Sequence, residues 1–125
     1  MIVSPYFFRA VLDVRCHQIT SSMKIAAAEA IARVAREDVS DQMIEAYGTN
    51  DLKFGRSYII PKALDDRLLV EIAAAIADVA CHEGLGDTCP ENIEVYKEQL
   101  YQRVLKKRSK VRKRLDKEEE QIHEV

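Results

Sequence analysis

The chain has 125 residues, a formal net charge of −2, and 47 % apolar and 32 % charged residues. This length corresponds to one domain or less, and the apolar content permits a globular core. The small net charge gives no reason to expect a polyanionic partner for the whole chain, and no run approaches the ~20 apolar residues of a membrane span. The apolar start, MIVSPYFF, lacks the basic region and the small-residue cleavage site of a signal peptide.

Two helices are predicted in the first third of the chain. A short helix is expected over residues 6–18, and a longer one over residues 20–40. Thr20 or Ser21 can begin the longer helix by accepting a hydrogen bond from a free backbone N–H group. Its apolar residues recur at helical spacing: Met23, Ala27, Ala30, Ile31 and Val34.

A short extended segment interrupts the helical pattern. Ser40 can cap a helix over residues 41–47, which Gly48 can end. The run SYII, residues 57–60, then has strand character, and Pro61 must end it because proline cannot donate to a ladder. A lone strand needs a partner, and the rest of the chain offers none.

The next predicted helix begins at Asp65 or Asp66, either of which can cap it. Gly84 is expected to end it. The apolar stripe of this helix contains Leu69, Ile72, Ile76, Val79 and Ala80.

A long final helix follows the turn-rich linker GLGDTCP, and Pro90 suits its first position. Its apolar stripe is thin: Ile93, Tyr96, Leu100, Val104, Val111 and Leu115. The run RVLKKRSKVRKR, residues 103–114, carries eight basic residues, and DKEEE then reverses the sign. Because acidic residues at a helix C-terminus oppose the macrodipole, this helix is expected to fray beyond Asp116.

Two ordered blocks and the last helix resemble the bacterial malic enzymes. FRAVLDVRCHQITSSMKIAAAEAIARVA, residues 8–35, is similar to a family segment close to FRGALDVRA..IN.EMK.AA..AIA.LA, and matches it at Phe8, Arg9, Leu12, Asp13, Val14, Arg15, Ile19, Met23, Lys24, Ala26 and Ala27. The second block, AYG...LKFGRSYIIPKALDDRL, resembles AYG...L.FG.EYIIPKPFDPRL and matches at Tyr58, Ile59, Ile60, Pro61, Lys62, Asp65, Arg67 and Leu68. ENIEVYKEQLYQRV resembles the helix that leads out of the malic enzyme domain in the long bacterial form, so the resemblance covers about residues 5–104.

The resemblance implies a fold and a function. The chain is expected to be mostly helical, with about five helices and one short extended segment, and to form the C-terminal part of a doubly wound, Rossmann-like α/β domain that binds NAD(P). Residues 1–86 would belong to that domain, and residues 87–125 would form an exit helix and a charged tail. The whole oxidoreductase would oxidise malate at C2 with NAD(P) and Mg or Mn, and decarboxylate the product to pyruvate in the cytoplasm.

Some positions depart from the family pattern. Ala10-Val11 stands in place of Gly-Ala, and Ala63, Leu64 and Asp66 replace Pro-Phe and a second proline. The functional groups of the family would all lie upstream of Met1. They are the dinucleotide loop, the Tyr and Lys acid–base pair, the metal-binding carboxylates and the substrate-contacting Asn. The resemblance therefore places no catalytic, cofactor or metal residue in this chain, which is expected to be an inactive scaffold without a cofactor of its own.

The residues themselves support that expectation. Phosphate binding needs a glycine-rich loop after a strand, whereas Gly84 and Gly86 follow a helix. Asp65 and Asp66 sit at a helix start, where capping explains them. The acidic run 118–120 reads as solvated. The cysteines Cys16, Cys81 and Cys89 have no CxxC spacing and are predicted to be reduced thiols, and the histidines His17, His82 and His123 are predicted to lie at the surface.

A second class of function stays open. The basic block, residues 103–114, could contact nucleic acid or protein, as part of a free-standing helical interaction protein. The block lacks aromatic residues, and Arg112–Asp116 and Arg114–Glu118 could partly neutralise it at i,i+4 spacing, so a solvated helix is preferred over nucleic-acid binding. The apolar faces around residues 23–34 and 69–79 would normally cover a sheet, so the isolated chain is expected to be a homo-oligomer or loosely folded.

Overall fold

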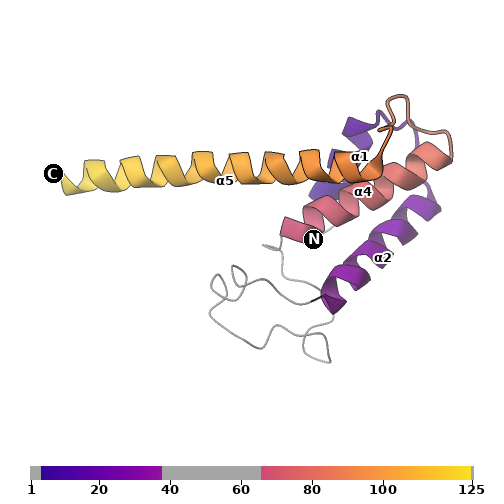
Figure 1. Cartoon of the computed structure of the whole chain (residues 1–125), viewed down its shortest axis with the longest axis horizontal. Coiled ribbons are helices and arrows are strands. Elements are labelled where there is room, and N and C mark those ends of the chain that lie inside the picture. Colours follow the sequence, from indigo (N-terminus) through magenta and orange to yellow (C-terminus); the bar gives the residue numbers. More distant parts are fainter. Residues whose placement is uncertain (1–3, 38–65, 125) are drawn as a thin grey trace.

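The computed structural model describes residues 4–37 and 66–124, and this part of the chain is mostly helical (Figure 1). Its helices, labelled as in Figure 1, are α1 (Ser4–Asp13), α2 (Ser21–Arg36), α4 (Asp66–His82) and α5 (Ile93–His123). The described residues contain no strand, only an isolated antiparallel bridge between Cys16 and Gly86. The predicted helix over residues 41–47 and the extended run SYII lie outside the described residues, so the expected total of five helices stays a prediction.

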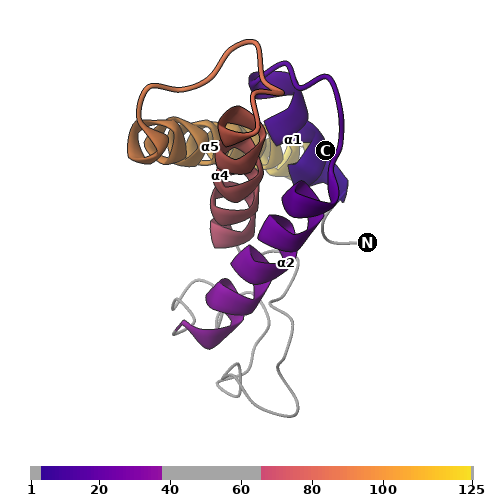
Figure 2. The same cartoon turned by 90° about the vertical axis from the view of Figure 1, so that its right-hand side faces the viewer.

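Helix α4 occupies the centre of the fold. It packs against α1, α2 and α5, and the views in Figures 1 and 2 show it running between α2 and the start of α5. A helix enclosed on several sides must be apolar around most of its circumference. The buried residues of α4 meet this requirement: Leu68, Val70, Ile72, Ala73, Ala74, Ile76, Ala77 and Ala80.

Helix α2 begins as predicted and buries the predicted stripe. Thr20 is the N-cap, and its Oγ1 accepts a hydrogen bond from the backbone N–H of Met23 at 3.4 Å. The stripe residues Met23, Ala27, Ala30 and Val34 are all buried. They face α4 rather than a sheet, which corrects the expectation that this stripe needs a sheet to cover it. Alanine is frequent on both helices, and side chains that end at Cβ let two helix axes approach closely.

Helix α1 is shorter than predicted. It ends at Asp13 rather than near residue 18, because Arg15 takes the left-handed conformation with φ +49°. This turn directs Cys16 toward the linker, where it forms the bridge with Gly86. The early end of α1 therefore depends on a contact with a segment some 70 residues further along the chain, which local spacing cannot predict.

Helix α4 ends where the sequence predicts, at a left-handed glycine. Gly84 has φ +71°, its N–H donates to the carbonyl of Cys81 at 3.1 Å, and the N–H of Leu85 donates to the carbonyl of Ala80 at 2.9 Å. These paired bonds form a Schellman motif. Glycine is favoured at position 86 for another reason: a Cβ there would lie 3.1 Å from both Cys89 Sγ and the Val14 carbonyl oxygen, which is closer than an ordinary van der Waals contact.

Helix α5 differs from the prediction at both ends. It starts at Ile93 rather than Pro90, because the Asn92 side chain accepts a hydrogen bond from the Glu94 N–H at 2.8 Å and acts as N-cap. It continues to His123, so the expected fraying beyond Asp116 is wrong in this structure. Lys, Arg and Glu are good helix formers, and each added residue extends a helix that already exists. The 31 residues reach about 45 Å, and the second half projects from the body (Figure 1).

The prediction of three reduced thiols is wrong for this structure. Cys81, at the end of α4, forms a disulfide with Cys89 in the linker, and Cys16 stays free. The two disulfide partners are eight residues apart, and the turn at Gly84 and Gly86 brings their Cα atoms to 5.8 Å. The spacing alone gives no hint of this pair, because the pairing depends on how the turn folds.

The disulfide predicts a defined pattern of thiol reactivity. Under non-reducing conditions, the folded chain is expected to be alkylated by iodoacetamide at Cys16 alone, since a disulfide sulfur does not react. After treatment with dithiothreitol, Cys81 and Cys89 should be modified as well. Peptide mass spectrometry measures both states. Alkylation of all the cysteines before reduction would contradict the pairing.

Candidate functional site

A partly buried charged cluster joins the end of α1 to the start of α5. We call it the Asp13 cluster, and its members are Arg9, Asp13, Tyr96 and Arg103. Arg9 and Asp13 lie one turn apart on α1, so both side chains leave the same face of that helix. Tyr96 and Arg103 are two turns apart on α5 and share a face with the buried Leu100. The spacing within each helix therefore presents these groups to the other helix.

Asp13 is the centre of the cluster. Its side chain is only 10 % exposed, and Arg9 forms an ion pair with its Oδ1. The Tyr96 hydroxyl donates to Oδ2 at 2.8 Å, and Arg103 Nη1 lies 3.4 Å from both oxygens. A buried carboxylate is tolerated only when charges and hydrogen bonds compensate for its lost hydration. Both helices contribute to that compensation here.

The cluster shifts the protonation of its members in opposite directions. Burial opposes ionisation of Asp13, but hydrogen bonds from Arg9 and Tyr96 and the charges of Arg9 and Arg103 outweigh it, so the pKa of Asp13 lies below its ordinary value. Burial, followed by the hydrogen bond to Asp13, raises the pKa of the Tyr96 hydroxyl well above its ordinary value. At neutral pH the carboxylate is therefore charged and the phenol stays a donor. The cluster is an ion-paired joint, not an acid–base pair poised near pH 7.

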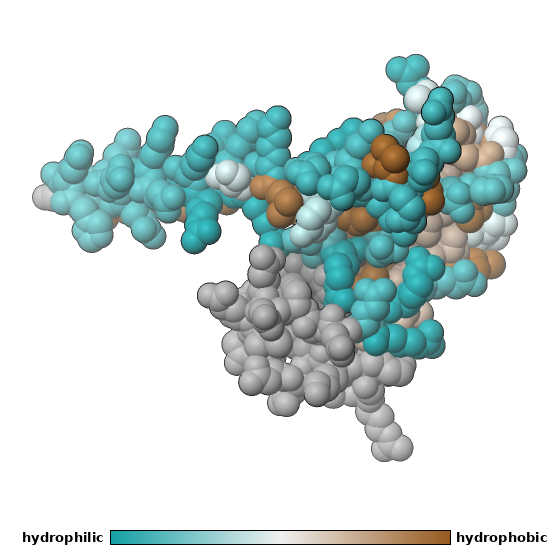
Figure 3. All heavy atoms as spheres, viewed as in Figure 1, coloured by the Kyte–Doolittle hydropathy of each residue, from teal (hydrophilic) through white to brown (hydrophobic). Residues whose placement is uncertain are grey.

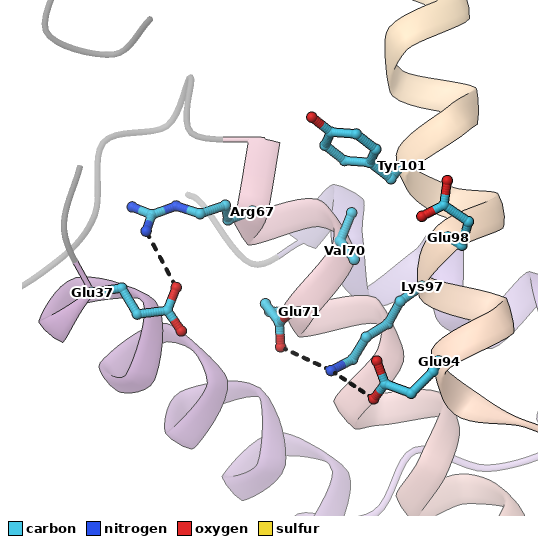
Figure 4. Close-up of a pocket in the computed structure, with 8 residues that line it drawn as sticks. All are labelled: Glu37, Arg67, Val70, Glu71, Glu94, Lys97, Glu98 and Tyr101. Carbon is cyan, nitrogen blue, oxygen red and sulfur yellow. Dashed lines mark hydrogen bonds and ion pairs between the residues drawn. The ribbon is translucent and has the colours of Figure 1, made fainter. Parts of the chain in front are cut away.

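A pocket of about 250 Å³ opens between α2, α4 and α5 (Figure 4). Ion pairs form much of its wall. Arg67 reaches Glu37 at 3.2 Å, and Lys97 lies 3.4 Å from both Glu71 and Glu94. These charges neutralise one another across the helix boundaries, and the pocket shows no cluster of unpaired groups aimed at a ligand. The ion pairs along its wall hold α5 and the end of α2 against α4.

Most N–H groups of the turn that contains Gly84 and Gly86 are hydrogen-bonded within the fold. The N–H groups of Gly84 and Leu85 donate to carbonyls at the end of α4, and the N–H of Thr88 donates to the Val14 carbonyl at 3.1 Å. A phosphate cradle requires several free N–H groups that point to one place, and these bonds leave few of them. Gly84 and Gly86 close the helix and let the linker approach residues 14–17.

The histidines of the described part lie at separate places in the fold. His17 Nε2 is 2.5 Å from Asp87 Oδ1, and His82 Nδ1 is 2.8 Å from the Asp78 carbonyl oxygen; both rings are exposed, as predicted. His123 is exposed near the end of α5. Among residues 4–37 and 66–124, no three His, Cys, Asp or Glu side chains converge in a way that could hold a metal ion.

Sequence reasoning missed the Asp13 cluster. The signal was present in the two spacings: an Arg–Asp pair at i,i+4 on α1, and a Tyr and an Arg seven residues apart beside Leu100 on α5. Either pair of residues, taken by itself, is typical of the surface of a helix. Only the tertiary contact of α1 with α5 shows that the two halves share one carboxylate.

The contacts of Asp13 predict how much removal of the Tyr96 hydroxyl lowers the free energy of unfolding. Tyr96 is 6 % exposed, so Tyr96→Phe removes a 2.8 Å hydrogen bond to a largely buried carboxylate and should lower the free energy of unfolding by about 1–3 kcal/mol. Urea unfolding followed by circular dichroism measures the change. Tyr101→Phe removes a hydroxyl from an exposed tyrosine of the same helix and should change the free energy of unfolding by less than about 0.5 kcal/mol. Equal effects of the two substitutions would contradict the role of Tyr96.

No protein-family model matches the chain. Individual proteins do. The NADP-dependent malic enzyme of Rhizobium meliloti is 46 % identical over 96 residues, which are 77 % of this chain and 13 % of that protein. The NADP-dependent malic enzyme of Escherichia coli is 42 % identical over 102 residues, 82 % of this chain and 13 % of that protein. An NAD-dependent malic enzyme of Rhizobium meliloti is 38 % identical over 96 residues, 77 % of this chain and 12 % of that protein.

The fold agrees with the sequence matches. The crystal structure of malic enzyme from Pyrococcus horikoshii Ot3 superposes with a TM-score of 0.60 and 33 % identity, over 78 % of this chain and 19 % of that chain. The resemblance inferred from the two sequence blocks is confirmed. The chain therefore belongs to the bacterial malic enzyme family, and it spans about 13 % of the length of the NADP-dependent malic enzymes of Rhizobium meliloti and Escherichia coli.

Proposed function

We propose that this chain forms the C-terminal end of the cofactor-binding domain of a malic enzyme and the helix that leads out of that domain. The whole enzyme would oxidise malate at C2 with NAD(P) and release a carboxyl group as CO₂ to give pyruvate, assisted by Mg or Mn. The names of the relatives support this activity, since they are NADP- or NAD-dependent malic enzymes. The cofactor-binding domain would have the doubly wound, Rossmann-like sheet, to which α2 and α4 contribute helices.

The Asp13 cluster is the observation that carries this proposal. Arg9 and Asp13 belong to the sequence block that resembles the family, whereas Tyr96 and Arg103 belong to the exit helix. The cluster fixes the exit helix directly to the family block. The domain boundary proposed near residues 86–87 falls in the linker between α4 and α5, so the two parts would meet across this joint.

Alignment lengths support the long bacterial form. The malic enzyme of Halomonas elongata aligns over 81 residues, which are 19 % of its length, so it is a shorter protein than the Escherichia coli relative, for which 102 residues are 13 %. The longer relative aligns over more of this chain. This pattern is expected if the exit helix belongs to the long form, in which a further domain follows it.

The described residues suit a scaffold role. They offer no convergent ligands for a divalent metal, and in the Gly84–Gly86 turn the N–H groups of Gly84 and Leu85 already donate to carbonyls of α4. We therefore assign no step of the reaction to them. Their contribution would be to hold the end of the domain in place through the α4 core and the Asp13 cluster.

The same proposal includes a cytoplasmic location, with the choice between NAD and NADP left to residues outside this chain. None of the described helices is long and apolar enough to cross a membrane. Cytoplasmic reductants keep most thiols reduced, so Cys81 and Cys89 would be a dithiol there and a disulfide after oxidation.

The second candidate is a free-standing helical interaction protein. The projecting half of α5 favours it, because every residue from 105 to 124 is exposed. This candidate and the scaffold role do not exclude each other, since they use different segments of the chain.

The scaffold role predicts that the chain alone has no malic enzyme activity. Purified chain with malate, manganese and NAD or NADP should form no NAD(P)H above the blank, because the family resemblance puts the metal, acid–base and pyrophosphate groups that the reaction needs outside these 125 residues. Absorbance at 340 nm measures the product. Co-expression with the N-terminal portion of a related malic enzyme should give a complex that co-purifies. Turnover by the chain alone would refute the scaffold role.

A further inference from the structure

A mostly apolar seam begins at Tyr101 and continues along the projecting half of α5. Steps of three and four residues along the helix connect Tyr101, Val104, Arg108, Val111, Leu115, Glu118 and Ile122. This is the spacing of the a and d positions of a coiled coil, and its apolar stripe is narrower than that of a helix packed on a globular core. Val111, Leu115 and Ile122 are 49 %, 54 % and 72 % exposed. Large apolar side chains at seam spacing on a solvent-exposed helix indicate a helical partner.

The charges on this half of α5 are separated into two blocks. Residues 103–114 are basic, and residues 116–120 are mostly acidic. The intrahelical pairs that the sequence suggested do not form: within the described part of α5, no ion pair joins Arg112 to Asp116 or Arg114 to Glu118. Figure 3 shows the projecting segment as a largely hydrophilic rod. Apart from Arg103 and Arg108, which contact Asp13 and Asp66, the charged side chains of the two blocks project into solvent and could meet a partner with the opposite order of charge.

A second copy of the chain has that order when its helix runs in the opposite direction. We propose that α5 pairs with α5 of a second copy in an antiparallel coiled coil centred on Lys113. In this register, Val104 faces Ile122 of the second copy, and Val111 faces Leu115 of the second copy. The two polar seam positions also match, since Arg108 faces Glu118 of the second copy.

The alternatives fit less well. In a parallel pair, the basic block of one chain would lie against the basic block of the other. Arg108 would then be opposite Arg108, and Glu118 opposite Glu118. An antiparallel pair shifted by one heptad would place Arg108 opposite Val111 or Val125 and leave its charge without a partner in the seam. In the centred register, Arg112 and Arg114 lie next to the two-fold axis of the dimer, each beside the same residue of the second copy. This like-charge contact limits the affinity.

Arg108 already has a partner within the chain. Its Nη1 lies 2.8 Å from Asp66 Oδ2 at the start of α4. A guanidinium has five N–H donors, so it can bind Asp66 and Glu118 of a second copy together. The seam would then continue directly from the contact that ties α5 to α4. The pairing does not depend on the proposed enzymatic role, because its seam contains no member of the Asp13 cluster.

Sedimentation equilibrium of the full chain tests the pairing. The wild-type chain should be a dimer at about 100 μM, with a dissociation constant that rises when NaCl screens the charge blocks. Leu115→Asp places a carboxylate in the seam and should raise the dissociation constant at least about tenfold. Ser109→Asp adds the same charge on the opposite, exposed face of α5 and should change it less than about twofold. Tris(2-carboxyethyl)phosphine excludes cross-linking through Cys16.

Exchange of the two polar seam residues tests the orientation. Glu118→Arg would place two arginines together in each Arg108 layer of the antiparallel dimer and should weaken it about tenfold or more. The double variant Arg108→Glu/Glu118→Arg restores opposite charges and should return the dissociation constant to within about threefold of wild type. In a parallel dimer, residues 108 and 118 each face the same residue of the other chain. Both contacts would therefore stay between like charges in either variant. A wild-type chain that stays monomeric, or a double variant that is not restored, would overturn the proposal.

Discussion

The ionised carboxylate of Asp13 is the constraint on which the arrangement of the helices depends. It is nearly removed from water, so it must be surrounded by positive charge and hydrogen-bond donors. Its own helix supplies Arg9, but the remaining donors, Tyr96 and Arg103, come from α5. Satisfying Asp13 therefore fixes both the position and the direction of α5. The projection of the second half of α5 away from the body follows from that anchoring.

The apolar core and the polar cluster have different tasks in this fold. Alanines and medium-sized residues on α2 and α4 bring the helices together, but such contacts tolerate sliding and rotation. The directional bonds to Asp13, with the Lys97–Glu71 and Arg108–Asp66 ion pairs, select one placement of α5 on α4. The proposed exit helix and the proposed self-pairing seam are thus successive segments of one rigid helix, anchored at its start and exposed at its end.

The parts of the fold that the sequence predicted are the local ones. The Thr20 cap, the α2 stripe and the glycine at the end of α4 follow from bonds within a few residues, and the structure confirms them. The end of α1 and the disulfide partner of Cys81 were missed, because each depends on a contact that the folded turn creates. The Asp13 cluster was missed for the same reason. The family resemblance was predictable because it rests on ordered blocks of residues rather than on contacts.

The pH dependence of stability tests the role of Asp13 most directly. Its pKa is lower in the folded chain than in the unfolded chain, so the stability that it contributes is present above its unfolded pKa of about 3.9 and is lost as the pH falls through its folded pKa. Urea unfolding of the wild-type chain and of Asp13→Asn between pH 7 and pH 2 measures this contribution. The account predicts that the wild type is more stable by a constant amount above about pH 5 and that the difference shrinks below about pH 4. A difference that is absent at pH 7, or that does not change with pH, would contradict it.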